Sequence, residues 1–115
     1  MRRRAHALFA VMLAIAAAYV IHRYLAALSI LIVGFGTAEA FASSALPDIL
    51  EPGTHPEHRG IFHSRRALAV SALLSLLGAI LMLSLSMWHY HVLFFGALGY
   101  SSHLMLDGMT GRLPR

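Results

Sequence analysis

The sequence predicts an all-α fold: an integral membrane bundle of four transmembrane helices, with one long cytoplasmic loop between helices 2 and 3. Apolar residues fill 58% of the 115 positions and charged residues only 12%, whereas soluble domains carry about 25% charged residues. The mean hydropathy is +0.69, and the apolar residues form four long runs. No run alternates apolar and polar residues as a strand would. Because the backbone of a segment in lipid must satisfy its own hydrogen bonds, the runs predict helices.

The runs predict helices over residues 5–21, 24–46, 65–88 and 92–108, in a single membrane domain that covers 1–115. A spanning helix needs about 20 residues. The second and third are long enough, the first is borderline, and the fourth must extend to Asp107 or Thr110 to reach this length. Short links at His22–Arg23 and His89–His91 make neighbouring helices antiparallel.

The long link over residues 47–63 holds three prolines and two glycines. Proline fixes the backbone and removes a hydrogen-bond donor, so an ordered loop is expected here rather than a helix. Ser64 stands where an N-cap of the third helix is expected.

Small residues at four-residue spacing predict which helix faces pack closely in lipid. These stripes are Gly36, Ala40 and Ser44 on the second helix, and Ser71, Ser75 and Ala79 on the third. On the fourth helix, Gly96, Gly99, His103 and Asp107 share one face, which predicts that the His and Asp side chains point into the bundle.

Arginine placement predicts the orientation. Eight of the nine arginines lie near the termini or in the 47–66 region, so the positive-inside rule places both termini and the long loop in the cytoplasm of a multi-pass inner-membrane protein. The pI of about 10.4 would also suit a nucleic-acid partner, but arginines that flank apolar runs contact anionic lipid, so no nucleic acid is expected. The start of the chain also has the pattern of a secretory signal peptide. The apolar run continues into a second helix after a very short link, which favours a membrane helix.

Polar residues that could carry chemistry gather in three stretches at the ends of the predicted helices. Residues 2–9, 46–64 and 99–110 contain five of the eight histidines and four of the five acidic residues. The topology brings all three stretches to the cytoplasmic face, where they could surround an ion. There is no cysteine, so a metal site must use nitrogen and oxygen donors, which suits zinc, manganese, iron, magnesium or nickel.

His103 and Asp107 are four residues apart on a helix, so their side chains project side by side and could bind one cation. The alternative is a mutual hydrogen bond that only satisfies both groups within the bundle. Taken alone, the pair favours this structural alternative, although intramembrane ionisable groups are more often functional.

In the long loop, His58 and His63 are candidate metal ligands, and Arg59 could bind an anion such as a phosphate oxygen. A contact between Arg59 and a lipid headgroup is the alternative. Asp48 or Glu51 could ligate metal or act as general base on a bound water, the alternative being a solvated carboxylate at the interface.

Other titratable residues have open or ordinary roles. His55 is a spare donor and Glu57 a solvated loop charge. Glu39 could be a buried partner of a ligand, a proton relay or a neutral carboxyl. His22, His89 and His91 lie at the opposite interface, where histidines beside aromatic residues are common.

Taken in order, these stretches resemble the YdjM-like family of small membrane-bound metal-dependent hydrolases. The motifs that carry the resemblance are Ala5-His6, Leu46-Pro47-Asp48, the His-Arg-Gly-x-x-His-Ser loop over 58–64, and the Ser-His-Leu-x-x-Asp-x-x-Thr motif over 102–110. Many relatives have Pro-Asp-x-Asp, whereas this chain has Glu51 one residue later. The resemblance implies a metal site built from His6, Asp48, His58, His63, His103 and Asp107.

From the chemistry of these residues, zinc is the first cofactor to expect, with manganese, iron, magnesium or nickel as alternatives. Asp48, Glu51 and Arg59 are the expected catalytic groups. The substrate would be an ester or phosphoester near the lipid headgroups, with membrane lipids as partners. The rival interpretation is a non-enzymatic membrane protein that binds or transports a divalent metal, or a scaffold whose polar cluster only locks the helices.

Overall fold

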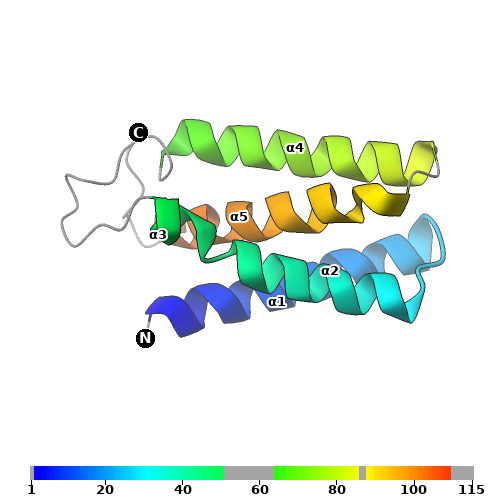
Figure 1. Ribbon diagram of the computed structural model, residues 1–115, viewed down its shortest axis with the longest axis horizontal. Coiled ribbons are helices and arrows are strands. Elements are labelled where there is room, and N and C mark those ends of the chain that lie inside the picture. Colours follow the sequence, from blue (N-terminus) through cyan, green and yellow to red (C-terminus); the bar gives the residue numbers. More distant parts are fainter. Residues whose placement is uncertain (1, 51–63, 86–87, 110–115) are drawn as a thin grey trace.

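The computed structural model describes residues 2–50, 64–85 and 88–109, and all regular structure in these ranges is helical. The elements, in chain order, are α1 (Arg2–Tyr24), α2 (Ile30–Ser43), α3 (Leu46–Leu50), α4 (Arg65–Ser84), the 3-10 turn η3 (Trp88–Tyr90) and α5 (His91–Met109) (Figure 1). The prediction of an all-α fold is confirmed.

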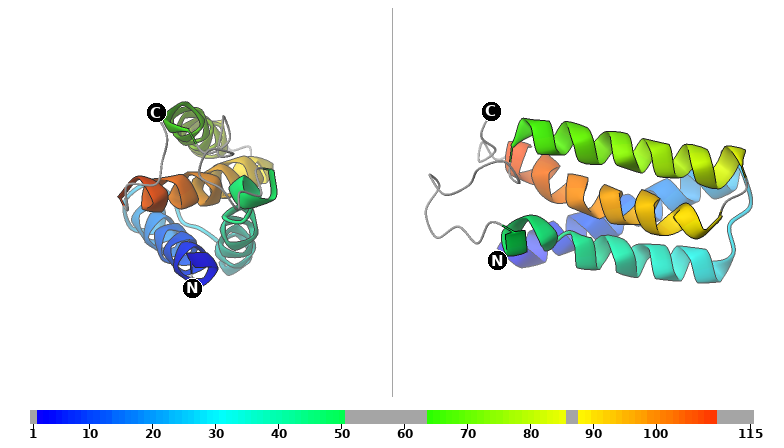
Figure 2. Two further views of the ribbon diagram at one scale, coloured as in Figure 1. Left: turned by 90° about the vertical axis from the view of Figure 1, so that its left-hand side faces the viewer. Right: turned by 45° about the horizontal axis from the view of Figure 1, so that its top comes forward.

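Helix α5 lies at the centre of the bundle. It packs against α1 and α2 on one side and against α4 on the other, while α4 packs mainly on α5. Seen end-on, α1 and α2 form a pair beneath α5, with α4 above it (Figure 2). The arrangement explains why the residues of α5 are the most buried: Phe95, Leu104, His103 and Asp107 are all nearly inaccessible.

Three helical segments are long and apolar enough to cross a membrane: α1, the α2–α3 segment over Ile30–Leu50, and α4. Their outward surfaces carry large apolar side chains, among them Leu8 (62% exposed), Ile30 (82%) and Leu73 (65%). Exposed apolar surface of this extent is unusual for a soluble monomer and suits a hydrocarbon surrounding. This is compatible with the expected membrane protein.

The first link is not at His22–Arg23, as predicted, but at residues 25–29. Helix α1 continues to Tyr24. The His22 ring holds the link in place, because its Nδ1 accepts a hydrogen bond from the backbone N–H of Leu28 at 3.0 Å. Ser29 then caps α2, with its Oγ accepting the N–H of Ile32 at 3.2 Å. These side-chain acceptors set the ends of both helices.

The helix predicted over 24–46 is divided in two, since α2 ends at Ser43 and α3 begins at Leu46. Ser44 Oγ donates to the carbonyl of Phe41 at 2.7 Å, and Pro47 follows in the first turn of α3, where no backbone donor is needed. The loop predicted over 47–63 is therefore helical at its start, and its remainder, 51–63, lies outside the described residues.

The later helices also differ slightly from the predicted bounds. Helix α4 ends at Ser84 instead of residue 88. Its predicted N-cap is confirmed, because Ser64 Oγ accepts the N–H of Ala67 at 3.1 Å. Helix α5 covers His91–Met109, one residue longer at each end than expected.

Close helix contacts occur where small residues face α5. A Cβ on Gly99 would collide with Ala40 and Ser43 of α2, and a Cβ on Gly78 of α4 would lie 2.7 Å from the backbone nitrogen of Phe94. Ser75 Oγ adds a hydrogen bond to the Phe94 carbonyl at 2.9 Å. The small-residue faces predicted on the second and third helices do pack.

Gly96 is the exception among the predicted small-residue positions. A Cβ there would meet nothing within 4 Å, so Gly96 does not mediate a close contact although it shares a helical face with Gly99.

Candidate metal centre

Three potential metal ligands from the two ends of the chain meet at one end of the bundle. His6 is near the start of α1, and His103 and Asp107 are in the last turns of α5. Their donor atoms all lie within 4.8 Å of one another, and among the described residues they form a group that could hold a metal ion. The His6 Nε2–H donates to Oδ1 of Asp107 at 2.9 Å, and His103 Nε2 lies 3.3 Å from Oδ2 of the same carboxylate.

All three residues are buried: His6, His103 and Asp107 are 7%, 2% and 1% exposed. The two imidazole rings stack, with centroids 4.0 Å apart. A buried carboxylate is costly unless it is paired with a cation or binds a metal. The two imidazoles pair with the buried Asp107 carboxylate, and the three groups could share an ion.

The backbone of α2 fixes the orientation of His103. Its Nδ1–H donates to the carbonyl oxygen of Ser44 at 2.8 Å. This contact directs Nε2 toward the carboxylates of Asp48 and Asp107, and in the neutral imidazole its lone pair could ligate a cation there. A backbone carbonyl on the far ring nitrogen is the usual way in which a metal-binding histidine is oriented.

Asp48 of α3 lies beside this group without belonging to it. Its Oδ1 lies 3.5 Å from His103 Nε2, and its side chain is 33% exposed, in contrast to the buried Asp107. Asp48 therefore lies at the boundary between the buried group and the outside, where a carboxylate could ligate an ion or take up a proton from a water molecule.

The separations of His103 from the two carboxylates suit a divalent cation. Ligand atoms about 2.0–2.1 Å from a tetrahedral zinc lie about 3.3–3.4 Å from one another. The separations of His103 Nε2 from Asp107 Oδ2 and from Asp48 Oδ1, 3.3 and 3.5 Å, are close to this value. Catalytic zinc sites often have two imidazoles and a carboxylate as ligands, with a fourth coordination position for water or substrate. His6, His103 and Asp107 offer the same donor types.

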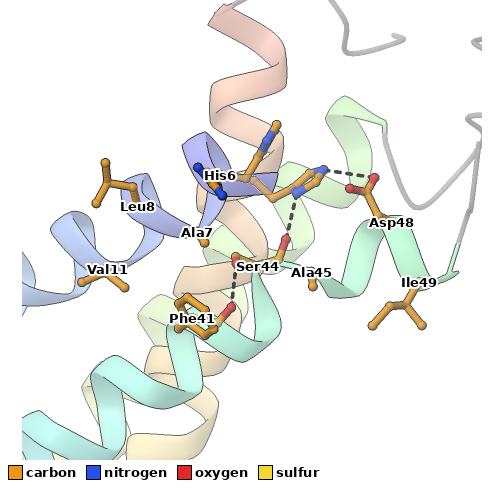
Figure 3. Close-up of a pocket in the computed structure, with 11 residues that line it drawn as sticks. His6, Ala7, Leu8, Val11, Phe41, Ser44, Ala45, Asp48 and Ile49 are labelled. Carbon is orange, nitrogen blue, oxygen red and sulfur yellow. Dashed lines mark hydrogen bonds and ion pairs between the residues drawn. The ribbon is translucent and has the colours of Figure 1, made fainter. Parts of the chain in front are cut away.

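A cavity of about 820 Å³ opens beside these donors, between α1 and the α2–α3 segment (Figure 3). His6, Asp48 and His103 line it together with Arg4, and the remaining lining is mostly apolar. This volume lies within the range of roughly 300–1,000 Å³ typical of ligand sites. Two of the three donor residues, His6 and His103, therefore border a cavity large enough for a molecule bigger than water.

Of the predicted site residues, the structure brings together His6, Asp48, His103 and Asp107. Those that lie outside the described residues are Glu51, His58, Arg59 and His63, together with the spare donor His55.

Sequence reasoning did not identify two groups at the site, the Ser44 carbonyl and the Arg4 side chain. The Ser44 carbonyl is a backbone group and has no sequence signal. Arg4 was counted only for orientation, although it lies two residues before His6 and lines the same cavity. Glu39, whose role was open, pairs with His91, their Oε1 and Nδ1 atoms being 3.0 Å apart.

No family model matches the chain, and no significant match was found among curated proteins or solved structures. The interpretation of the site therefore depends on its own geometry and chemistry.

Proposed function

We propose that this protein is a membrane-bound, metal-dependent hydrolase that acts on an ester or phosphoester near the lipid headgroups. In this proposal α5 is the fourth transmembrane helix, since it is 19 residues long and lies among the three apolar segments. The helices cross the inner membrane, and the donor group and both termini lie on its cytoplasmic side, as the arginine distribution favours.

The observation that carries the proposal is the buried group His6, His103 and Asp107 beside an open cavity. A purely structural cluster would need no cavity next to it. Three protein ligands with an accessible side are typical of catalytic metal sites, whereas structural sites are closed. Zinc is the first ion to expect, because the donors are imidazole nitrogens and carboxylate oxygens.

A divalent cation held here would lower the pKa of a water molecule and polarise an ester or phosphoester oxygen. The protein supplies the remaining functions. Ser44 fixes the His103 ring, and Asp48, partly exposed at the cavity, is placed to accept a proton. Glu51 is the alternative base, and Arg59 is proposed to bind the anionic part of the substrate.

A non-enzymatic metal-binding or metal-transporting protein is the second candidate, and a scaffold is the third. They share the donor group with the hydrolase but require no turnover. The 33% exposure of the Asp48 side chain favours the hydrolase. A carboxylate that served only to retain a metal ion or to hold the helices together would be expected to be as buried as Asp107.

Metal analysis combined with turnover tests the proposal. Detergent-purified protein is expected to contain about one equivalent of a divalent metal and to hydrolyse a nitrophenyl phosphodiester or ester. His103→Ala should lose both. His89→Ala is the matched control, since His89 is exposed and lies against Tyr90 at the other end of α5.

Well under one equivalent of metal in the wild type, unchanged in His103→Ala, would remove the basis for hydrolysis. Metal binding that is lost in His103→Ala, without turnover of any ester, would favour the metal-binding alternative.

A further inference from the structure

The cavity beside the donor group changes character along its length. At the end of the bundle its wall includes Arg4, His6, Asp48 and His103. About one to two helical turns deeper, the wall is made by Leu8 and Val11 of α1 and Phe41 of α2. From Arg4 to Val11 the rise along α1 is about 10 Å. The cavity is therefore polar at headgroup depth and apolar toward the centre of the bilayer.

The apolar part of the cavity opens sideways between α1 and the α2–α3 segment. Its rim residues are strongly exposed, Leu8 by 62%, Phe41 by 55% and Ile49 by 66%. Ala7 and Ala45 line the wall between the larger residues and leave space there (Figure 3). Since these surfaces face the hydrocarbon layer if α1 and α2–α3 cross the membrane, a lipid tail could enter from the bilayer without passing through water.

The charged groups at the polar end of the cavity determine whether an anionic or a cationic headgroup would be attracted. Arg4 is permanently cationic, and a cation bound by His6, His103 and Asp107 would add positive charge beside it. The Asp48 and Asp107 carboxylates are the opposing charges, and both are positioned against His103. A divalent cation together with Arg4 would outweigh them by one positive charge. An anionic headgroup at this end would therefore be attracted, and a cationic one repelled.

We infer that the cavity is the binding groove for an anionic lipid amphiphile. Its headgroup lies at Arg4 and the donor group, and its hydrocarbon tail lies along Leu8, Val11 and Phe41. This inference rests on the proposed function and deepens it, because it names the substrate class and its route. The amphiphile would reach the site laterally from the membrane.

A non-hydrolysable probe separates binding from turnover. The probe is a dodecyl phosphonate with a photoreactive diazirine at the end of its tail, added to the metal-loaded protein in neutral detergent. Crosslinks are expected at residues 8–11 and 41–45. Excess unlabelled dodecyl phosphonate should suppress them, whereas excess dodecyltrimethylammonium or inorganic phosphate should not.

Crosslinks on the lipid-facing surface of α4, around Leu73 and Leu76, provide the internal control. These residues are 65% and 57% exposed and lie away from the cavity. Non-specific contact with the detergent-embedded surface should be suppressed equally by both amphiphiles.

Two matched substitutions test the groove itself. Ala45→Trp fills the cavity wall, whereas Ala42→Trp places the same ring on the exposed surface of α2, outside the lining. Both positions are exposed, so neither substitution disturbs a packed core. Losing burial of about two methylenes corresponds to roughly a tenfold loss of affinity, so competition by the phosphonate should weaken about tenfold in Ala45→Trp and stay unchanged in Ala42→Trp.

Arg4→Gln should reduce the preference for phosphonate over trimethylammonium while tail crosslinks at residues 8–11 persist. Equal competition by the two amphiphiles in the wild type, or equal behaviour of Ala45→Trp and Ala42→Trp, would overturn the groove.

The inference and the proposed function can fail separately. Specific phosphonate binding without turnover of any ester would uphold the groove and remove the hydrolase. Turnover of esters, with probe competition that is unaffected by Ala45→Trp, would uphold the hydrolase and remove the groove.

Discussion

The two ends of the bundle each contain a histidine–carboxylate pair, and the pairs differ in what surrounds them. At one end, His6 and Asp107 are 2.9 Å apart with side chains 9% and 1% exposed. At the other, His91 and Glu39 are 3.0 Å apart with side chains 23% and 24% exposed. The distance is nearly the same, but within the described residues it is the first pair that has a second imidazole, a second carboxylate and a cavity beside it.

The comparison shows that a pair alone does not make a metal site. His91 lies 12 residues before His103 on α5, about 18 Å along the helix axis. Glu39 and His91 can satisfy each other as an inter-helix hydrogen bond. His6, His103 and Asp107 bring more donors together than mutual hydrogen bonding requires, so theirs is the end that could hold an ion.

The largest effect is expected from exchanging the central carboxylate. Asp107→Asn keeps the shape but removes the charge shared by the two imidazoles, so metal affinity should fall by about a hundredfold or more, and turnover should disappear. Equilibrium dialysis against zinc measures this. Glu39→Gln is the matched change at the other end and should leave metal affinity unaltered; equal losses in the two variants would contradict the distinction between the ends.

Asp48→Asn should affect turnover more than binding. Its carboxylate is partly exposed and lies 3.5 Å from His103 Nε2, so it is placed to accept a proton, a role typically worth about 10²–10⁴ in rate. Single-turnover hydrolysis beside a metal titration separates the two effects. Normal turnover in Asp48→Asn would show that another residue is the general base, and Glu51 would be tested next.

The contact between α2 and α5 should be sensitive to one methyl group. A Cβ on Gly99 would collide with Ala40 and Ser43, so Gly99→Ala should destabilise the bundle by about 1–3 kcal/mol. It should also weaken metal binding, because Ser44, which orients His103, is on the displaced segment. Gly96→Ala adds the same methyl group into open space. Thermal unfolding in detergent compares the two, and equal melting temperatures would rule out the close contact.

The smallest effect is expected for the pair at the opposite end. Glu39→Gln retains a hydrogen-bond acceptor for His91 and should change stability by less than about 1 kcal/mol. Unfolding in the same detergent checks this value. A loss of several kcal/mol would mean that the Glu39–His91 pair is a principal lock of the bundle, which would reverse the comparison between the ends.

The sequence was informative about where elements run and less so about where they stop. Four apolar runs predicted an all-helical chain, and antiparallel order predicted that the start of α1 and the end of α5 would share an end with Asp48. The link at residues 25–29 was misplaced because apolar residues continue through it, and the stop depends on the His22 ring accepting the Leu28 N–H.

Other parts of the site depend on contacts between residues far apart in the chain. The hydrogen bond from His103 to the Ser44 carbonyl joins residues 59 positions apart, and the Glu39–His91 pair joins residues 52 apart. Spacing within one helix predicts neither. The i,i+4 relation of His103 and Asp107 was readable from the sequence because both are on α5.

X-ray absorption at the zinc edge tests most directly whether the buried group holds an ion. Zinc-loaded wild-type protein should give a shell of nitrogen and oxygen at about 2.0–2.1 Å, with the outer-shell scattering of at least two imidazoles, and His6→Ala should remove one of them. A spectrum of hydrated zinc, or one that is identical in wild type and His6→Ala, would contradict a centre built from His6, His103 and Asp107.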